Sequence, residues 1–490
     1  MRGKWIKWFK MSGVNRDAPV GIQCLQKLSS AWCPRFQINR LRWYQASVLI
    51  LTYFTYMTYH LTRKPISVVK SVLHQNCSAL TPPPGVRPGD DQWCNWAPFN
   101  TKDANTLLGT LDSAFLFSYA GAMFVSGMIA ERVDLRYFLS LGMLVSSIFC
   151  YLFGLGRTLD VHDISYYLLV QAGAGIAQTT GWPGTVAIVG KWFGNAKKGL
   201  IFGLWNSHTS LGNILGTVMA AEYVEHDWSL SFIYPALVMG IVALFVFLFL
   251  PPEPRNVGLT LSTERTAASL RPSRHSANSP PYQQDDVTEE TALLSHRSSR
   301  PNGGAVSLSR ALSIPGVVEF SLSLFFAKLV SYTFLYWLPL YINSSSGVVG
   351  AALAGLLADC VGAPACVCIV FYGICAPVLL AYQTWGALSY TLNVALLVTA
   401  GVLVNGPYAL ITTAVSAELG THSSLAGDAQ ALATVTAIID GTGSIGAAVG
   451  PMVAGVVSSA GSWRGVFYML VSCDLVALLL LLRIAKCEIF

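Results

Sequence analysis

The stretch "ASVLILTYFTYMTYHLTRKPISVVK", residues 46–70, begins as apolar sequence typical of a membrane helix and continues into four basic side chains: His60, Arg63, Lys64 and Lys70. Two interpretations are open. Either the helix has reached water and the cations simply end it, or the cations stand inside a membrane and meet a negatively charged partner. Which interpretation is right depends on how the rest of the chain crosses the membrane. The answer determines which function the sequence predicts.

Composition places the chain among membrane proteins. Of its 490 residues, 53% are hydrophobic and 11% are charged, whereas a soluble protein of this length would carry about 25% charged residues. Apolar runs of roughly 20 residues, enough to cross a hydrocarbon core of ~30 Å, recur along nearly the whole chain. We therefore expect an all-α polytopic protein in the lipid bilayer. The net charge of +6 does not indicate nucleic acid, given where the cations lie.

The apolar runs predict twelve spans, six on each side of a polar stretch. The candidate spans are about 43–72, 105–130, 136–156, 164–189, 199–222 and 229–250, then 314–342, 347–360, 364–383, 388–416, 429–457 and 464–484. The predicted domains are an N-terminal tail (1–42), an N-terminal bundle (43–250), a linker (251–312), a C-terminal bundle (313–484) and a C-terminal tail (485–490). The linker is rich in Pro, Ser, Arg and acidic residues, which predicts disorder.

Basic residues predict the orientation. Nine Lys and Arg precede residue 43 and seven Arg lie in 251–312, while the loops of opposite parity are poor in cations. The positive-inside rule then places both termini and the linker in the cytosol. The 73–104 loop falls on the far side, where the sequon at Asn76 fits glycosylation and where Cys77 and Cys94 could pair as a disulfide. The remaining cysteines lack the spacing of metal ligands, so we expect no metal site.

The two halves share a pattern at matching positions. Gly127 and Glu131 leave span two, and Gly355 and Asp359 leave span eight, each pair separated by three residues. Such an echo is typical of a duplicated six-helix unit. Span eight breaks the regularity, because 347–360 supplies about 13 apolar residues, too few to cross at 1.5 Å per residue. Either a piece is missing or this helix is incomplete.

The orientation bears on the cations of the opening stretch. If they merely ended span one, they would lie at its non-cytosolic edge, against the predicted topology. Residues 43–74 can instead form one long helix, in which Tyr56, His60, Arg63 and Ser67 share a face through spacings of four, three and four. Cations at mid-membrane cost about 2.5–3.5 kcal/mol each, so they normally face a cavity and mark a substrate path. We expect these side chains, together with Lys64, to line a pore.

Other spans supply candidate partners. "WNSHTSLGN" (205–213) places Asn206 and His208 in span five; interhelical hydrogen bonding explains the asparagine equally well, whereas histidine also titrates near neutrality. Lys328 in span seven either lines the cavity, with Tyr332 one turn further, or snorkels to the cytosolic edge. Asp440 in span eleven is either the counter-ion of an unloaded cation or purely structural.

Basic side chains around a cavity with one acid describe an anion site. Phosphate carries about −1.5 to −2 charges near neutral pH and offers three strong acceptor oxygens, to which Arg presents a planar fork and Lys a point charge. If the site is empty, its uncompensated positive charges would have to pass through an occluded, low-dielectric state, which disfavours reorientation of the empty transporter. A site loaded with a dianion is near neutral and can reorient. Exchange of one phosphate-bearing solute for another follows from that asymmetry, although a uniporter could use the same charges.

Long motifs carry a family resemblance. "HLTRKPISVVKSVLHQNC", "LWNSHTSLGNILG", "FAKLVSYTFLYWLPLYI" and "IIDGTGSIGAAVGP" occur in order between residues 43 and 484. Together they resemble the vertebrate sugar-phosphate exchangers of the glucose-6-phosphate exchanger type, within the organophosphate:phosphate antiporters of the major facilitator superfamily. The resemblance implies the major facilitator fold, with twelve helices in two pseudo-symmetric bundles, exchange of glucose 6-phosphate for inorganic phosphate, and residence in the endoplasmic reticulum membrane.

The same resemblance assigns residues. Arg63 and Lys64 match the family's phosphate-binding pair on the first helix, and His208 matches the histidine on helix five of the bacterial relatives. Those relatives use an arginine on helix seven, and Lys328 lies about one turn from it. Between Ile342 and Gly347 the family has roughly twenty more residues, which leaves helix eight truncated and the chain's transport competence in question.

The function predicted is therefore a phosphate-linked antiporter that exchanges a sugar phosphate for inorganic phosphate across an intracellular membrane by alternating access. The alternatives are an organic-anion carrier of endolysosomes, which the acidic dileucine pattern "EETALL" (289–294) favours, and a transport-incompetent scaffold, which the short span eight favours. No enzyme is expected, because no catalytic triad order, P-loop or dinucleotide fingerprint occurs in a suitable context. We expect no cofactor, and the sequence identifies no protein partner.

Overall fold

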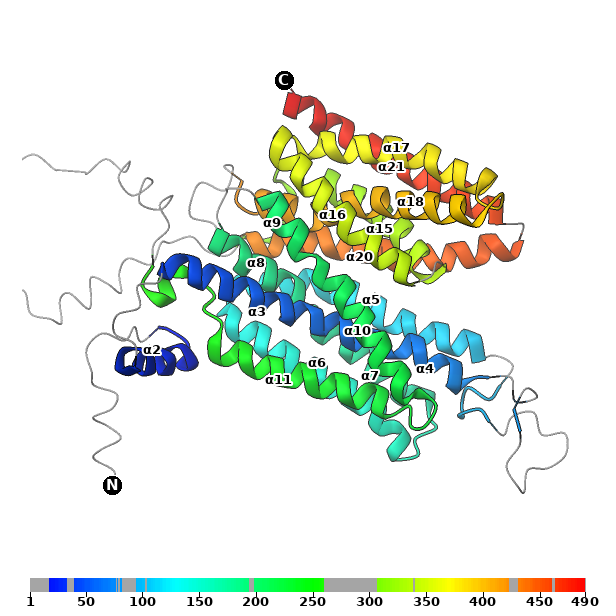
Figure 1. Cartoon of the computed structure of the whole chain (residues 1–490), viewed down its shortest axis with the longest axis horizontal. Coiled ribbons are helices and arrows are strands. Elements are labelled where there is room, and N and C mark those ends of the chain that lie inside the picture. Colours follow the sequence, from blue (N-terminus) through cyan, green and yellow to red (C-terminus); the bar gives the residue numbers. More distant parts are fainter. Residues whose placement is uncertain are drawn as a thin grey trace, which may run out of the picture.

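The computed structural model describes residues 17–32, 39–75, 77, 80–81, 94–101, 104–193, 198–259, 306–337, 340–422, 431–460 and 463–489. Within these ranges the chain is helical and has no β-strand. Eight of the described helices are long and apolar enough to cross a membrane by length and composition. Figure 1 shows the long helices running in one general direction. The prediction of an all-α polytopic membrane protein is confirmed.

The helices of the first half, in chain order, are α2 (Val20–Trp32), α3 (Arg40–Arg63), α4 (Pro65–Leu73), α5 (Ala104–Ala130), α6 (Leu135–Thr158), α7 (Ile164–Gln178), α8 (Gly181–Phe193), α9 (Lys198–Trp205), α10 (Ser207–Val224), α11 (Leu230–Phe249) and the 3-10 turn η2 (Pro254–Val257). Those of the second half are α14 (Leu308–Leu312), α15 (Val317–Trp337), α16 (Leu340–Val361), α17 (Pro364–Trp385), α18 (Tyr390–Leu410), the π-helix η3 (Ile411–Val415), α19 (Ser416–Leu419), α20 (Leu432–Ala460) and α21 (Trp463–Ile489).

Three predicted spans are each built from two helices, and the break in the first is decisive for the site. The single helix expected over 43–74 is wrong: α3 ends at Arg63, and Lys64 serves both as its C-cap and as the N-cap of α4. Pro65 causes the break because it has no N–H to donate to the preceding turn and is favoured at the first helical position. The hydrogen bonding of the helix is therefore interrupted immediately beside the Arg-Lys pair, although Lys64 keeps helical dihedral angles.

Helix eight is complete, which corrects the expectation of a truncated span. α16 has 22 residues and starts at Leu340, so the polar segment at 343–346 lies within the helix. At 1.5 Å per residue the helix is about 33 Å long, enough to cross a bilayer core. The error arose because span seven was extended to residue 342, whereas α15 ends at Trp337. Ser and Asn have only moderately unfavourable helix propensities, so a short polar run need not interrupt a helix.

The predicted linker and C-terminal tail are also corrected where the structure describes them. Residues 254–257 and 308–312 form short helices, and Lys191 pairs with Glu253 at 2.7 Å, so the two ends of the linker are ordered. The rest of the linker, with "EETALL", lies outside the described residues. α21 continues to Ile489, and the carboxylate of Glu488 accepts hydrogen bonds from the N–H groups of Ala365 and Cys366 at the start of α17.

The long helices form two groups that meet along an interface. In the first group α3 packs on α10, α6 on α11 and α5 on α7; in the second, α15 packs on α20, α16 on α18 and α17 on α21. Figure 1 separates the groups clearly, with α3, α6 and α11 below and α17, α18 and α21 above. The groups contact one another through α5 with α20 and through α16 with α9 and α10.

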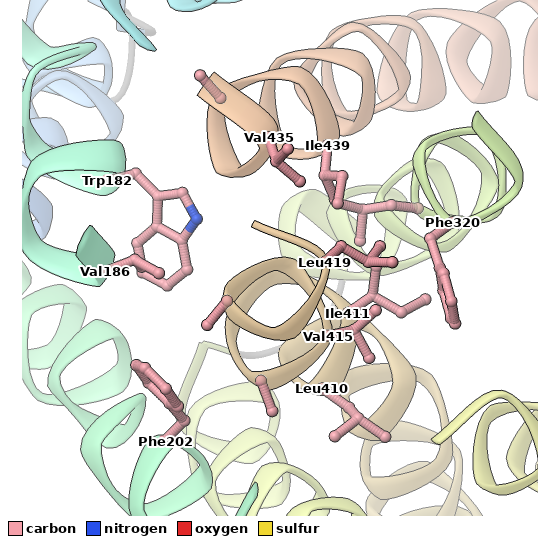
Figure 2. Packing of buried hydrophobic residues seen from close by; sticks show 14 of the residues in the cluster. Trp182, Val186, Phe202, Phe320, Leu410, Ile411, Val415, Leu419, Val435 and Ile439 are labelled. Carbon is pink, nitrogen blue, oxygen red and sulfur yellow. The ribbon is translucent and has the colours of Figure 1, made fainter. Parts of the chain in front are cut away.

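One end of this interface is packed shut. We call it the closed end; it is the end at which α3 begins and α21 finishes. Figure 2 shows Trp182, Val186 and Phe202 of the first group facing Val435 and Leu419 of the second, and all five belong to one buried apolar cluster.

Polar contacts reinforce the closed end. Glu131, from the repeated Gly-x-x-x-acid pattern, follows α5, and its carboxylate accepts hydrogen bonds from the N–H groups of Ala433 and Thr434 at 2.5 and 3.3 Å. These amides belong to the first turn of α20, where a helix has unpaired donors and a partial positive charge. The acid that marked an internal repeat therefore links the two groups of helices.

The opposite end carries the predicted disulfide. Cys77 and Cys94 are bonded across 17 residues, and the side chain of Asn95 accepts a hydrogen bond from the N–H of Gln75 next to the bridge. Asn76, the predicted glycosylation acceptor, lies outside the described residues. The bridge thus ties the segment after α4 to the segment before α5.

Candidate functional site

A cavity with two compartments lies at the interface between the two groups of helices. The narrow compartment encloses about 310 Å³ of empty space. The wide compartment holds about 1370 Å³ out to open solvent and extends along α4, away from the closed end. Both are lined by His60, Arg63, Asn206, Thr209, Tyr332 and Tyr408. These shared residues mark the place where the two compartments join.

Arg63 occupies the junction. Its Nε donates to Oε1 of Gln178 at 2.5 Å, and its guanidinium carbon lies 4.9 Å from the ring centre of Tyr119. Its Nη2 is buried and has no hydrogen-bond partner within the described structure. Gln178 is itself fixed, because its amide nitrogen donates to Thr62 at 3.3 Å. The guanidinium is thus held in one orientation with a donor left unused, which is the requirement for binding an anion.

Lys64 and Lys70 differ in their partners. Lys64 lines the wide compartment and makes no ion pair with any residue that the structure describes. Lys70 pairs with Asp112, a residue of α5 that also lines this compartment. Of the four cations in the opening stretch, Lys70 is therefore neutralised locally, while Arg63 and Lys64 are not.

Lys328 approaches the narrow compartment from the other group of helices. Its side chain is 4% exposed, so it does not snorkel to the membrane edge. Its Nζ lies 2.5 Å from Oδ1 of Asp440 and 3.3 Å from the hydroxyl of Ser444, and the hydroxyl of Tyr119 donates to Oδ2 of Asp440 at 3.2 Å. A line of contacts thus runs from Arg63 through Tyr119 and Asp440 to Lys328.

The two predicted histidines are placed differently. His60 lines both compartments, and its Nδ1 lies 3.3 Å from Oδ1 of Asn213. His208 is fully buried and lines neither compartment. It stands behind Tyr56, with ring centres 4.9 Å apart, and against Trp205 at 4.3 Å. His208 thus supports the wall from behind, and its spacing in the sequence could not indicate which face of the helix it would occupy.

The remaining predicted residues lie on the cavity wall. Tyr56 and Asp440 line the narrow compartment, and Asn206 and Tyr332 line both. Sequence reasoning missed Tyr119, Gln178 and Tyr408. A glutamine inside an apolar span was a signal for Gln178, whereas nothing distinguishes the two tyrosines from the many aromatic residues of the chain.

Comparisons with known proteins identify the family of the chain. A family model described as Major Facilitator Superfamily matches residues 95–432. Glucose-6-phosphate exchanger SLC37A2 of Danio rerio is 48% identical, over 92% of this chain and 94% of its own length. The human protein of that name is 46% identical with the same coverage, and glucose-6-phosphate exchanger SLC37A1 of Mus musculus is 42% identical over 96% of both chains.

Solved structures support the fold alone. A variant of the E. coli fucose:proton symporter FucP matches with a TM-score of 0.55 and 12% identity, over 89% of this chain and 98% of that one. FucP in an outward conformation matches with a TM-score of 0.53 and 13% identity, at the same coverage. The sequence relatives and the fold converge: this chain belongs to the Major Facilitator Superfamily and, within it, to the family of the SLC37 glucose-6-phosphate exchangers.

Proposed function

We propose that the protein is an antiporter that exchanges a sugar phosphate, glucose 6-phosphate, for inorganic phosphate by alternating access. One observation carries the proposal: Arg63 of the first group of helices and Lys328 of the second line the same narrow compartment. A phosphoryl group bound there would contact both groups at once. Its arrival and departure would therefore change the interaction between the bodies that must move relative to each other.

The charge of the site fits a dianion. Arg63, Lys64 and Lys328 supply three positive charges around the cavity, Asp440 supplies one negative charge, and Asp112 is cancelled by its partner Lys70, which leaves two positive charges when His60 is neutral. A phosphate ester carries about −1.5 to −2 charges near pH 7. The loaded site is then close to neutral and can pass through an occluded, low-dielectric state, whereas the empty site resists it. Exchange is favoured over net flux for that reason.

Alternating access would use the two six-helix units, 43–250 and 313–484, as the moving bodies. The apolar packing and the Glu131 contacts at the closed end support a state in which the cavity communicates with the disulfide-bearing end. For transport, that packing must separate and the other end must close. Such rocking about a central site is typical of transporters with internal repeats.

We place the protein in the endoplasmic reticulum membrane with both termini in the cytosol. The distribution of Lys and Arg supports this orientation. The Cys77–Cys94 bridge supports it independently, because disulfides form and persist in oxidising compartments such as the lumen. An organic-anion carrier of endolysosomes is the second candidate, favoured only by "EETALL". The 22-residue α16 removes one reason for considering a transport-incompetent scaffold, namely the short span eight.

Reconstituted vesicles test the proposal. Vesicles loaded with inorganic phosphate should take up labelled glucose 6-phosphate, and empty vesicles should not. Arg63→Ala and Lys328→Ala should lose uptake, whereas Arg310→Ala, which removes an exposed cation of α14 that does not line the cavity, should behave as the parent. Equal uptake into empty and loaded vesicles would rule out strict exchange, and unaffected uptake by Arg63→Ala would rule out the site.

A further inference from the structure

The wide compartment contains amide side chains that phosphate binding does not need. Gln171, Asn206 and Asn213 line it, together with the aromatic residues Phe115, Phe149, Phe153 and Phe232. Asn213 contacts His60. Gln171 and Asn206, in contrast, make no side-chain hydrogen bond with any residue that the structure describes. Two amides without a partner among the described residues therefore line the wide compartment.

Asn206 is fixed where the two compartments meet. It forms the break between α9, which ends at Trp205, and α10, which begins at Ser207, and it lines both compartments beside Arg63 and Tyr332. An amide in this position reaches the atoms next to a phosphoryl group held by Arg63. Because an amide offers both donors and an acceptor, it matches a hydroxyl or an ester oxygen better than a second anion.

Gln171 lies further from the phosphate compartment. It precedes Gln178, the partner of Arg63, by seven residues on α7, so the two share a face of that helix at a separation of about 10.5 Å along its axis. That separation is comparable to the length of an extended hexose phosphate. The aromatic side chains that line the same compartment suit the C–H faces of a sugar ring, and the amides suit its hydroxyl edge.

We propose that Asn206 and Gln171 bind the sugar hydroxyls, with Asn206 contacting the part of the substrate nearest the phosphate and Gln171 the far end of the ring. The inference rests on the proposed function, since it divides that substrate between two compartments. The cations determine whether an anion binds, and the two amides determine how strongly a sugar phosphate is preferred over inorganic phosphate. A site built to hydrogen-bond a hydroxyl discriminates strongly against solutes that lack it.

Exchange of phosphate for phosphate isolates the role of Gln171, because this residue lines only the wide compartment and inorganic phosphate has no group that extends to it. Vesicles loaded with phosphate are given labelled phosphate, and unlabelled glucose 6-phosphate or glycerol 3-phosphate is added as competitor. Gln171→Leu keeps the size of the side chain and removes its hydrogen bonds. We expect it to raise the inhibition constant of glucose 6-phosphate about tenfold, a loss of about 1.4 kcal/mol, and to leave that of glycerol 3-phosphate unchanged.

Asn206→Leu should weaken both competitors, because Asn206 lines both compartments and contacts the part of the substrate next to the phosphate, which glucose 6-phosphate and glycerol 3-phosphate share. Asn393→Leu is the matched control, since its amide bonds to the carbonyl of Gly386 and it does not line the cavity. Unchanged inhibition constants in Gln171→Leu, or equal weakening of both competitors by it, would overturn the proposal. A parent that exchanges phosphate but not glucose 6-phosphate would overturn the proposed function instead.

Discussion

Asp440 holds Lys328 in an ion pair inside the membrane, with Oδ1 2.5 Å from Nζ, and its second carboxylate oxygen accepts a hydrogen bond from Tyr119 in the other group of helices. The carboxylate offsets the cost of burying the ammonium. A phosphate bound to Lys328 in the narrow compartment, as proposed above, would compete with Asp440 for the same cation. The acid foreseen as either counter-ion or structural is a counter-ion in this state.

Asp440→Asn should convert the site to one that binds phosphate more tightly and moves it more slowly. Without the carboxylate the cavity has one more positive charge, so the loaded site is no longer neutral when it passes through the occluded state. We expect KM for external phosphate to fall and the maximal exchange rate to drop about tenfold, a barrier increase of about 1.4 kcal/mol. Asp112→Asn, which changes another cavity acid, serves as the comparison. Parallel losses in both variants would contradict a specific role for Asp440.

The same pair makes a prediction for stability. Removing one partner of a buried ion pair leaves an uncompensated charge and typically costs about 3–5 kcal/mol, whereas an apolar replacement of both can be neutral. Lys328→Met alone and Asp440→Leu alone should therefore lower the thermal midpoint of the detergent-solubilised protein more than the double variant does. Additive losses in the double variant would indicate that the two side chains are not coupled.

The sequence predicts the membrane spans well because burial in lipid is an energetic requirement that hydropathy records directly. Pro65 indicates a local disturbance of the first span, and the structure has the helix break there, at Lys64. The sequence does not locate the break at Asn206, which no proline marks. The start of α16 was missed for a related reason: helical backbone bonds tolerate the polar run at 343–346, which a hydropathy scan interprets as a loop.

Some residues of the site could be predicted from the sequence and others could not. Charged residues such as Arg63 and Lys328 are conspicuous in apolar sequence because their insertion is costly, and both lie on the cavity wall. Periodicity alone cannot orient a helix around its axis, so His208 was expected on the wall but packs behind Tyr56. Tyr119 gave no signal, because its role arises only where α5 meets α20.

Gln178→Leu should reduce exchange although residue 178 need not touch the substrate. Its carbonyl oxygen holds Nε of Arg63 at 2.5 Å and its amide nitrogen is held by Thr62, so the substitution releases the guanidinium from its fixed orientation. A preorganised fork binds phosphate better than a mobile one. We expect KM for phosphate to rise about tenfold, or about 1.4 kcal/mol. Arg63→Lys retains the charge without the fork and should show a loss of similar size, whereas full activity in Arg63→Lys would mean that charge alone suffices.

Glu131→Ala should loosen the closed end. The substitution removes the acceptor that caps the first amides of α20, an interaction worth about 0.5–2 kcal/mol at helix N-termini. The readout is the labelling rate of Leu432→Cys by a membrane-impermeant maleimide added at that end, corrected for labelling of the natural cysteines in the parent. Leu432 is buried beside Gly190, so its labelling should be slow with Glu131 and faster without it. Glu131→Gln retains an acceptor oxygen and should lie between the two, and equal rates in all three would show that apolar packing alone keeps the end closed.

Cys94→Ser should increase glycosylation at Asn76. The bridge to Cys77 constrains the sequon Asn76-Cys77-Ser78, and a constrained acceptor is poorly presented for modification in the lumen. Cys94→Ser leaves the sequon intact, so a larger fraction of the protein should shift in mobility on removal of N-glycans. Asn76→Gln supplies the unmodified reference.

Cys94→Ser should also lower the stability of the protein, because a bridge that closes a loop of this length contributes about 3 kcal/mol in chain-entropy models. Only a lumenal loop can be glycosylated. A mobility shift that occurs in Cys94→Ser and is lost in the double variant Cys94→Ser with Asn76→Gln would therefore also fix the orientation of the chain. If Cys94→Ser shows no shift at all, the result would count against the assignment of this loop to the lumen.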